Sequence, residues 1–336
     1  MPAKPLLLSS SPHLFAPVST RRIMLAVVAA LVPTTVFGLY LYGPRAILLV
    51  AATVVAAVAA EWIFGLALKR PTSIGDCSAV VTGLLLALTL PPSTPWWMAV
   101  LGAVVAIVVA KEFFGGIGAN PFNPALIGRA FLLMSFPAAI TTWHKPFEGI
   151  VDAASTATPL NMVKQGASWA DVFASVGAQD RGGFYWQLFL GNRSGSLGES
   201  SILLVAAGGL LLLAIGVIQA WIPAAVLAST ALFSWLLGMD PLFSLLSGGV
   251  VFGAFFMATD YATSPLTTKG KLVYGAAIGL LIALIRKLGG FPEGVTYAIL
   301  VMNMLSPYLD RMRTKKYGYV KPAKPAPAPA AKEAAK

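Results

Sequence analysis

Long apolar runs separated by short polar stretches constrain this chain more than any other feature. The first set of runs covers about 23–42, 46–67, 78–91, 96–110 and 122–140, and the second covers about 201–219, 221–238, 242–259, 271–288 and 294–309. A helix needs about 20 residues to span a bilayer. With 57% apolar and 11% charged residues, a soluble domain could not bury this much apolar surface. The sequence predicts an all-α polytopic membrane protein with about ten transmembrane helices.

Several runs are shorter than a full span and are bounded by Gly or Pro, which is typical of broken helices. The run 78–91 ends in Pro91-Pro92, and the run 294–309 follows the sequence GGFPEG. A weak repeat relates the third run of each set, because the same spacing separates Gly83, Thr89 and Pro95 as separates Gly253, Thr259 and Pro265. Two sets of five spans have opposite orientations, so we expect two inverted five-helix repeats.

Polar segments divide the chain into five parts. We expect an N-terminal segment at 1–22, repeats at 23–140 and 201–312, a loop region at 141–200, and a disordered Pro/Ala/Lys-rich tail at 313–336. The N-terminus does not have the pattern of a cleavable signal peptide. A larger set of basic residues falls on the side of the termini: Arg21, Arg22, Lys69, Arg70, Lys111, Lys269, Lys271, Arg311, Arg313, Lys315 and Lys316. The positive-inside rule then predicts cytoplasmic termini and places the 141–200 loop region on the outer face.

Charge and cysteine usage exclude several classes of protein. The net charge of +11 is dispersed along the chain, which argues against nucleic-acid binding. The single cysteine, Cys77, excludes an internal disulfide and a multi-cysteine metal site within this chain. The two histidines, His13 and His144, do not suggest a haem pair. Any redox role therefore needs a cofactor that is not held by thiolates or imidazoles.

Acidic residues within or at the ends of the apolar runs are candidates for an ion pathway, because carboxylates are costly there. The strongest are Asp76, Asp260 and Glu293, and the others are Glu61, Glu112 and Asp310. Asp260 lies beside Thr259, Thr263 and Ser264, whose oxygens suit a hard cation. For Glu112 and Asp310, a position facing the lipid headgroups is an equal alternative. Arg129, within the fifth run, could pair with one of these acids or with an anionic ligand.

Three polar segments could bind a ligand or could be structural. The pairs Asn120-Pro121 and Asn123-Pro124 predict an unwound start of a helix, which suits either a polar heterocycle or a re-entrant turn. The glycine-rich segment 191–200 could bring amides to a phosphate, or be only a loop. In DAASTATPL, residues 152–160, Thr158-Pro159 fits a helix cap followed by Pro at the first helical position. Residue types alone leave open whether Thr158 is a cap or a modified threonine.

These segments together resemble the RnfD/NqrB family over about residues 8–312. The resemblance is carried by SSSPHLFAPVSTRRIML, DCSAVVTGLLLALTLPPSTPWW, KEFFGGIGANPFNPALIGRAFL, DAASTATPL, GSLGES, MATDYATSPLTTKG and FPEGVTYAILVMNMLSPYLDR. The short segment before the first run is more similar to RnfD than to NqrB, which usually carries a longer N-terminal part.

The resemblance implies two flavins. In this family, a loop of the form Asp-x-x-Ser/Thr-Gly-Ala-Thr is read by a flavin transferase, which attaches FMN through its phosphate to the last Thr. Asp152, Ser155, Ala157 and Thr158 match this pattern, whereas Thr156 stands where Gly is usual. Thr158 is therefore the implied attachment residue, and we expect it to be exposed and flexible. A second, noncovalent riboflavin is implied among the helices, and we expect it near Asn120 and Asn123.

The function implied is that of a subunit of an ion-translocating oxidoreductase in the bacterial or archaeal cytoplasmic (inner) membrane. It would relay electrons between reduced ferredoxin and NAD, coupled to Na⁺ or H⁺ movement, within lipid and beside Rnf subunits A, B, C, E and G. Partner subunits would bind ferredoxin and NAD. Two alternatives remain: the B subunit of the sodium-pumping NADH:quinone oxidoreductase, and a channel or solute transporter of similar inverted-repeat architecture.

Overall fold

The computed structural model describes residues 19–69, 73–144, 146–147, 158–191, 193–290 and 294–311. Within these ranges the chain is helical and contains no β-strand. Three helical segments are long and apolar enough to cross a membrane: α1 (Thr20–Tyr42), α2 (Pro44–Ala67) and the segment Trp96–Phe114. This architecture confirms the predicted all-α polytopic fold, while the number of ten spans stays a prediction.

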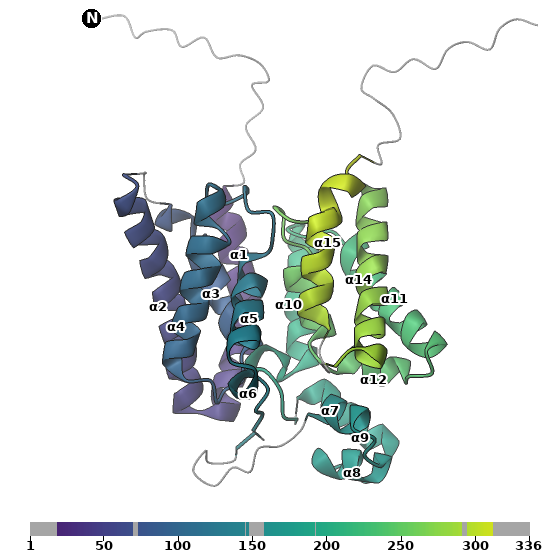
Figure 1. Ribbon diagram of the computed structural model, residues 1–336. Coiled ribbons are helices and arrows are strands. Elements are labelled where there is room, and N and C mark those ends of the chain that lie inside the picture. The colour runs from purple at the N-terminus through teal and green to yellow at the C-terminus, as the bar shows by residue number, and fades with distance from the viewer. Residues whose placement is uncertain are drawn as a thin grey trace, which may run out of the picture.

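The helices form two groups that stand side by side (Figure 1). The first group contains α1, α2, α3 (Ser78–Thr89), α4 (Trp96–Val104) with its π-helical extension η2 (Val105–Val109), and α5 (Pro124–Ser135). The second group contains α10 (Ile202–Ile215), α11 (Trp221–Leu236), α12 (Pro241–Leu246), α13 (Val250–Phe252), η5 (Gly253–Met257), α14 (Thr268–Leu288) and α15 (Val295–Leu309). The two groups coincide with the two sets of apolar runs in the sequence.

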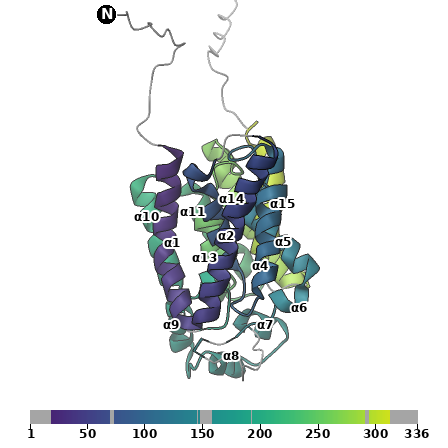
Figure 2. The same cartoon turned by 90° about the vertical axis from the view of Figure 1, so that its left-hand side faces the viewer.

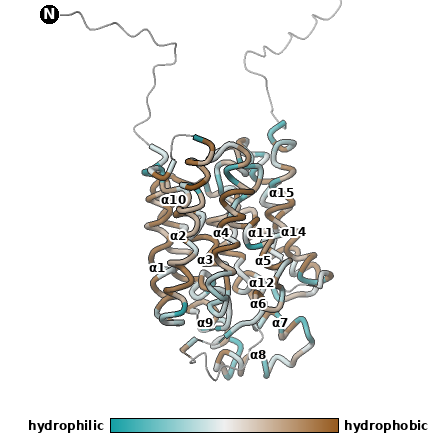
Figure 3. Tube along the Cα trace, turned by 60° about the vertical axis from the view of Figure 1, so that its left-hand side comes forward, coloured by the Kyte–Doolittle hydropathy of each residue, from teal (hydrophilic) through white to brown (hydrophobic). Residues whose placement is uncertain are grey.

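The two ends of the helix bundle differ in what they carry. The first residues of α1 and the last residues of α15 lie at one end, which we name the terminal end (Figures 1 and 2). Three short helices, α7 (Pro159–Lys164), α8 (Trp169–Ser175) and α9 (Arg181–Leu190), lie at the opposite end, which we name the outer end. Apolar residues dominate the helices between these ends, and polar residues gather toward both ends (Figure 3).

Close helix contacts hold each group together and join the two groups. In the first group, a Cβ at Gly83 of α3 would lie 2.9 Å from the Val54 Cα of α2. In the second group, a Cβ at Gly279 of α14 would lie 1.9 Å from the Ser229 Oγ of α11. Between the groups, a Cβ at Gly208 of α10 would lie 2.3 Å from the Ala30 carbonyl oxygen of α1. Small residues let these backbones approach, as is usual in membrane helix packing.

Two apolar runs that look continuous in the sequence are divided in the structure. The run 242–259 is interrupted after α12, where Gly248 and Gly249 both have positive φ angles, of 65° and 66°. A left-handed conformation suits glycine, so the chain can leave α12 and enter α13 in a new direction. The run 122–140 divides at Phe136 into α5 and the short helix α6 (Pro137–Ile140).

The outer segment is more ordered than a simple loop. Helices α7–α9 pack around a small apolar cluster that includes Leu160, Val172, Phe184 and Leu188, and Phe243 of α12 joins it. Phe184 and Leu188 are fully buried. This cluster ties the outer helices to the second helix group.

Candidate functional site

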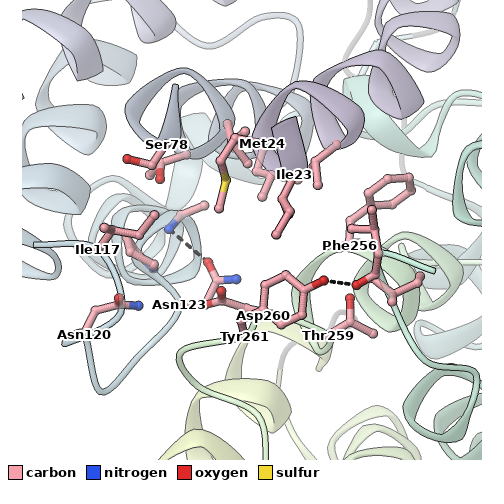
Figure 4. Close-up of a pocket in the computed structure, with 18 of the residues that line it drawn as sticks. Ile23, Met24, Ser78, Ile117, Asn120, Asn123, Phe256, Thr259, Asp260 and Tyr261 are labelled. Carbon is pink, nitrogen blue, oxygen red and sulfur yellow. Dashed lines mark hydrogen bonds between the residues drawn. The ribbon is translucent and has the colours of Figure 1, made fainter. Parts of the chain in front are cut away.

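A cavity of about 770 Å³, partly open to solvent, lies at the terminal end between the two helix groups. Its wall combines residues of α1 and α3 with the unwound segment before α5 and the segment after η5. Figure 4 shows Ile23 and Met24 across the cavity from Asn123 and Asp260. The structure thus brings Asn120, Asn123 and Asp260 together, although the sequence separates them widely.

Asn123 links the two helix groups at this cavity. Its Oδ1 accepts hydrogen bonds from the backbone N–H of Ala125 at 3.1 Å and of Leu126 at 3.3 Å, which caps α5. Its Nδ2 donates to the carbonyl oxygen of Met257 at 3.3 Å, at the end of η5. The Asn-Pro pattern therefore marks a real unwound helix start, and its amide spans the boundary between the groups.

The predicted ion-pathway acids have different positions. Asp260 lines the cavity and accepts a hydrogen bond from the Thr263 hydroxyl at 3.2 Å. Asp76 accepts from the N–H of Ser78 at 2.7 Å, and it is Ser78 that lines the cavity. Asp310 accepts from the Leu266 N–H at 2.7 Å. Glu293, the third strong candidate, lies outside the described residues.

Lys111 and Glu61 form a buried ion pair at the edge of the cavity. The sequence did not predict that these two residues pair. Lys111 lines the cavity, and its Nζ lies 2.9 Å from Glu61 Oε2, 2.6 Å from Ser78 Oγ and 3.9 Å from Glu112 Oε1. Ser73 also donates to Glu61. Lys111, Glu61 and Glu112 are all buried, so Glu112 faces the protein rather than the headgroups. A Lys-Glu pair directly after an apolar run was the available signal.

Thr158 caps α7, as the Thr-Pro pattern predicts. Its hydroxyl oxygen accepts a hydrogen bond from the Asn161 N–H at 3.2 Å, and Pro159 is the first helical residue. The expectation of an exposed Thr158 is wrong, because the residue is only 7% exposed. Leu160 explains this burial: it belongs to the outer apolar cluster and draws the start of α7 inward. The other residues of the implied attachment motif, Asp152, Ser155 and Ala157, lie outside the described residues.

A second cavity, of about 240 Å³, lies beside Thr158 at the outer end. Arg193, Ser194 and Glu199 from the glycine-rich segment line it, together with Ser247 and Gly248 from the break between α12 and α13. The sequence predicted a possible phosphate-binding loop at 191–200, but it did not single out any of these residues individually. The glycine-rich segment contributes a buried arginine here.

Glu199 connects this outer cavity with the interior. It also lines a cavity of about 310 Å³, whose wall includes Arg129 and Thr89. Arg129 Nη1 donates to the Thr89 carbonyl oxygen at 2.5 Å, at the end of α3. Polar groups therefore continue from the outer cavity into the protein between the two helix groups.

The two implied flavins place different demands on these cavities. The cavity at Asn120, Asn123 and Asp260 measures about 770 Å³ together with its opening to solvent. Amide groups and apolar side chains line it beside Asp260 and Lys111, and the amides fit the polar edge of a heterocycle. The Thr158 cavity is smaller, and a buried arginine lines it together with Thr158. These residues fit the phosphate-bearing end of an attached FMN.

Comparison of the sequence with known proteins identifies its relatives. The family model described as NQR2, RnfD, RnfE matches residues 7–318. The chain is 43% identical over 329 residues to the D subunit of the Na(+)-translocating ferredoxin:NAD(+) oxidoreductase complex of Acetobacterium woodii, covering 96% of this chain and 98% of that protein. It is 42% identical over 312 residues to the D subunit of the proton-translocating ferredoxin:NAD(+) oxidoreductase complex of Clostridium ljungdahlii, covering 90% and 93%. It is 41% identical over 327 residues to the D subunit of the ion-translocating oxidoreductase complex of Stutzerimonas stutzeri, covering 89% and 92%.

Proposed function

The chain belongs to the NQR2, RnfD and RnfE family, and we propose that it is the flavin-carrying membrane subunit of an Rnf complex. In this role it relays electrons between reduced ferredoxin and NAD while the complex moves Na⁺ or H⁺. The names of its relatives support the complex and the subunit. Since relatives of equal similarity carry a sodium name and a proton name, identity does not select the ion.

The position of Thr158 is the observation that carries the flavin part of the proposal. Its hydroxyl lies beside a cavity that contains Arg193, whose charge matches a phosphate. Thr158 can both cap α7 and carry the flavin, because both roles require it at the start of that helix. When bound, FMN supplies one-electron and two-electron transfer, and this chain holds its phosphate end at the outer end.

The large cavity at the terminal end supports a second flavin, riboflavin, held without a covalent bond. Asn120 and Asn123 would offer amide groups to a polar ring edge, while Met24 and Phe256 offer apolar contact. A cofactor here lies near the boundary between the helix groups, as expected for sites in inverted-repeat folds.

Asp260 provides a physical basis for coupling electron flow to ion movement. It lines the same cavity, and it lies beside the Thr263 hydroxyl. Negative charge that arrives in a site of low dielectric attracts a cation. We expect Asp260 to bind that cation, with Asp76 holding the neighbouring Ser78 in place.

The remaining parts of the role follow from the complex. Ferredoxin and NAD would bind partner subunits, and a flavin transferase would modify Thr158. The terminal end carries Arg22, Lys69, Lys269 and Arg311, so the positive-inside rule favours the cytoplasmic side of the inner membrane for this end. Helices α7–α9 would then face the compartment outside that membrane.

In-gel flavin fluorescence tests the attachment. The parent subunit and Thr158→Ala are each coexpressed with the transferase, purified, denatured and viewed under ultraviolet light. We expect a fluorescent parent band and a dark Thr158→Ala band, with Thr156→Ala as a fluorescent control. A dark parent band, beside an active transferase on a control substrate, would reject the flavin proposal and favour a channel or transporter.

Ion transport by reconstituted complexes tests the role of Asp260. Asp260→Asn should lower cation uptake into vesicles while flavin content stays at the parent level. Equal loss of both quantities would show that Asp260 supports the structure of the cavity rather than the ion.

A further inference from the structure

A buried asparagine on α15 stands behind the wall of the cavity at the terminal end. Asn303 of α15 and Tyr274 of α14 are both buried, and neither lines the cavity, whereas Asn123 does. The carbonyl of Ile299 lies beside one end of the Asn303 amide, and the N–H of Asn123 lies beside the other. A carbonyl only accepts and an N–H only donates, so these two neighbours fix the orientation of the amide.

In this orientation the Asn303 amide bonds to all three of its polar neighbours. Its Oδ1 accepts from the Asn123 N–H at 3.1 Å, and its Nδ2 donates to the Ile299 carbonyl at 3.2 Å and to the Tyr274 hydroxyl at 2.6 Å. One side chain thus joins α14 and α15 of the second helix group to the unwound start of α5 in the first group.

The Asn123 N–H needs such an acceptor because of its place in the chain. Asn123 is the capping residue of α5, and the N–H of a capping residue has no acceptor within its own helix. A buried N–H that lacks an acceptor is costly. Asn303 supplies the acceptor, which lets this segment stay unwound inside the protein.

Two contacts hold Asn123 against the second helix group. The Asn303 oxygen binds its backbone N–H, and the Met257 carbonyl accepts from its side-chain Nδ2 at 3.3 Å. The backbone contact sets where the start of α5 lies. The side-chain contact orients the amide, whose Nδ2 carries a second hydrogen for a ligand in the cavity.

We propose that Asn303 is a positioning residue for the noncovalent flavin, with Tyr274 holding its amide in place. This inference rests on the proposed function, since it concerns the site where that flavin would bind. Asn303 acts through Asn123, whose side chain forms part of the cavity wall. A donor held in a fixed position favours the charge that a flavin gains on reduction. Asn303 therefore supports both the retention of riboflavin and its midpoint potential.

Asn303→Leu tests this role by replacing the amide with an apolar side chain of similar shape. In the purified complex, we expect riboflavin to dissociate about tenfold faster than from the parent, because a buried N–H loses its acceptor. We also expect a redox titration to give a lower midpoint potential for the noncovalent flavin. Covalent flavin, measured by in-gel fluorescence, should stay at the parent level, since α7 lies at the opposite end of the bundle.

Tyr274→Phe is a milder form of the same test that preserves the shape of the core. It removes only the hydroxyl, so the Asn303 amide keeps its bond to the Ile299 carbonyl but loses one of the contacts that fix it. We expect smaller changes in the same direction for riboflavin release and for the potential. Met302→Leu is the matched control, because Met302 is the buried, apolar neighbour of Asn303 in the chain, and it should match the parent.

The outcomes separate this inference from the proposed function. Parent-like release and potential in both Asn303→Leu and Tyr274→Phe would overturn the positioning role while the riboflavin site stands. If Asn303→Leu does not fold, parent-like values in Tyr274→Phe alone would overturn it. Equal changes in Met302→Leu would also overturn it, because they would show a general effect of packing. A parent complex without riboflavin would instead reject the second flavin of the proposed function, and this inference with it.

Discussion

Lys111 and Arg286 hold corresponding places in the two helix groups. Lys111 comes shortly after η2, which ends the fourth helical segment of the first group. Arg286 lies in the last turn of α14, the fourth helical segment of the second group. Lys111 binds the start of the third segment in its group, and Arg286 binds the break in the third segment of its group. Lys111 Nζ donates to Ser78 Oγ at 2.6 Å, at the start of α3. Arg286 Nη2 donates to the Ser247 carbonyl at 2.7 Å, at the break before α13. The two contacts lie at opposite ends of the bundle, as an inverted repeat requires.

The Lys111–Glu61 pair should behave as one unit. Both side chains are buried, so removing one partner leaves the other charge poorly compensated; after loss of Glu61, Lys111 keeps only the longer contact of 3.9 Å to Glu112 among the described ion pairs. We expect Lys111→Met and Glu61→Gln each to lower the free energy of unfolding by about 3 kcal/mol. The double variant should lose clearly less than the sum, as measured by thermal unfolding in detergent. Additive losses would show that the 2.9 Å contact contributes little.

Arg286 should be needed for the second group to assemble. Arg286→Met leaves the carbonyls of Ser244 and Ser247 without this donor, and each such loss costs about 1–3 kcal/mol. We expect reduced yield of folded protein in size-exclusion chromatography. Lys287→Met is the matched control, because Lys287 is the next residue and is exposed. Similar yields for the two variants would contradict the role of Arg286.

The contact between α11 and α14 should not tolerate a methyl group at Gly279. A Cβ there would lie 1.9 Å from Ser229 Oγ and 2.6 Å from the Thr230 nitrogen. Gly279→Ala must push the helices apart, so we expect a loss of about 1–3 kcal/mol in the free energy of unfolding. Gly290→Ala should unfold at the parent temperature, because nothing lies within 4 Å of a Cβ at that position.

The outer helices should loosen in acid through Asp240. Burial alone would raise the pKa of this carboxyl, but hydrogen bonds from Tyr185, the Phe243 N–H and Arg181 outweigh it and hold the pKa below its usual value. The stabilisation is therefore complete above the unfolded pKa of about 3.9, and it is lost as the pH falls through the lower folded value. The hydrogen-exchange protection of the α9 amides, relative to an unfolded chain at the same pH, should stay high from neutral pH down to that range and then fall.

Asp240→Asn supplies the control for this pH dependence. The variant lacks the titrating carboxylate, so its exchange in α9 should already be faster at neutral pH and should change less in acid. If parent and variant lose protection at the same pH and by the same amount, Asp240 is not the responsible group.

The two flavins should respond to different substitutions. Asn123→Asp keeps the oxygen that caps α5 but loses the donor to Met257. We expect less acid-extractable flavin in this variant and unchanged in-gel fluorescence. Thr158→Ala should show the opposite pattern. Unchanged extractable flavin in both Asn123→Asp and Asn120→Ala would exclude the large cavity as the riboflavin site.

Local sequence signals predicted helix ends well. The Asn123-Pro124 and Thr158-Pro159 pairs both mark the first residues of helices, because a side-chain oxygen caps the backbone and proline fits the first turn. The break at Gly248 was missed, since the surrounding residues keep an apolar pattern on both sides. Hydropathy does not distinguish a straight helix from one that bends at two glycines with positive φ.

Contacts between distant segments were beyond reach from sequence. Glu61 and Lys111 looked like separate charges near membrane edges, and only packing places them 2.9 Å apart. The same holds for Thr158 and Arg193, which line one cavity although a long stretch of chain separates them. Charge counting placed the Thr158 segment at the end opposite the termini, but it could not show that Leu160 would draw the threonine inward.

The burial of Thr158 bears on the order in which this protein would fold and be modified. In the folded chain, Thr158 is 7% exposed and its hydroxyl oxygen accepts a hydrogen bond from the Asn161 N–H. If Thr158 carries the proposed flavin, we expect the flavin to be attached before α7 packs against Gly248. In a chain that folds first, Thr158 would become accessible to the transferase only through local unfolding of that region. The relative rates of folding and modification would then set the share of subunits that carry the proposed flavin.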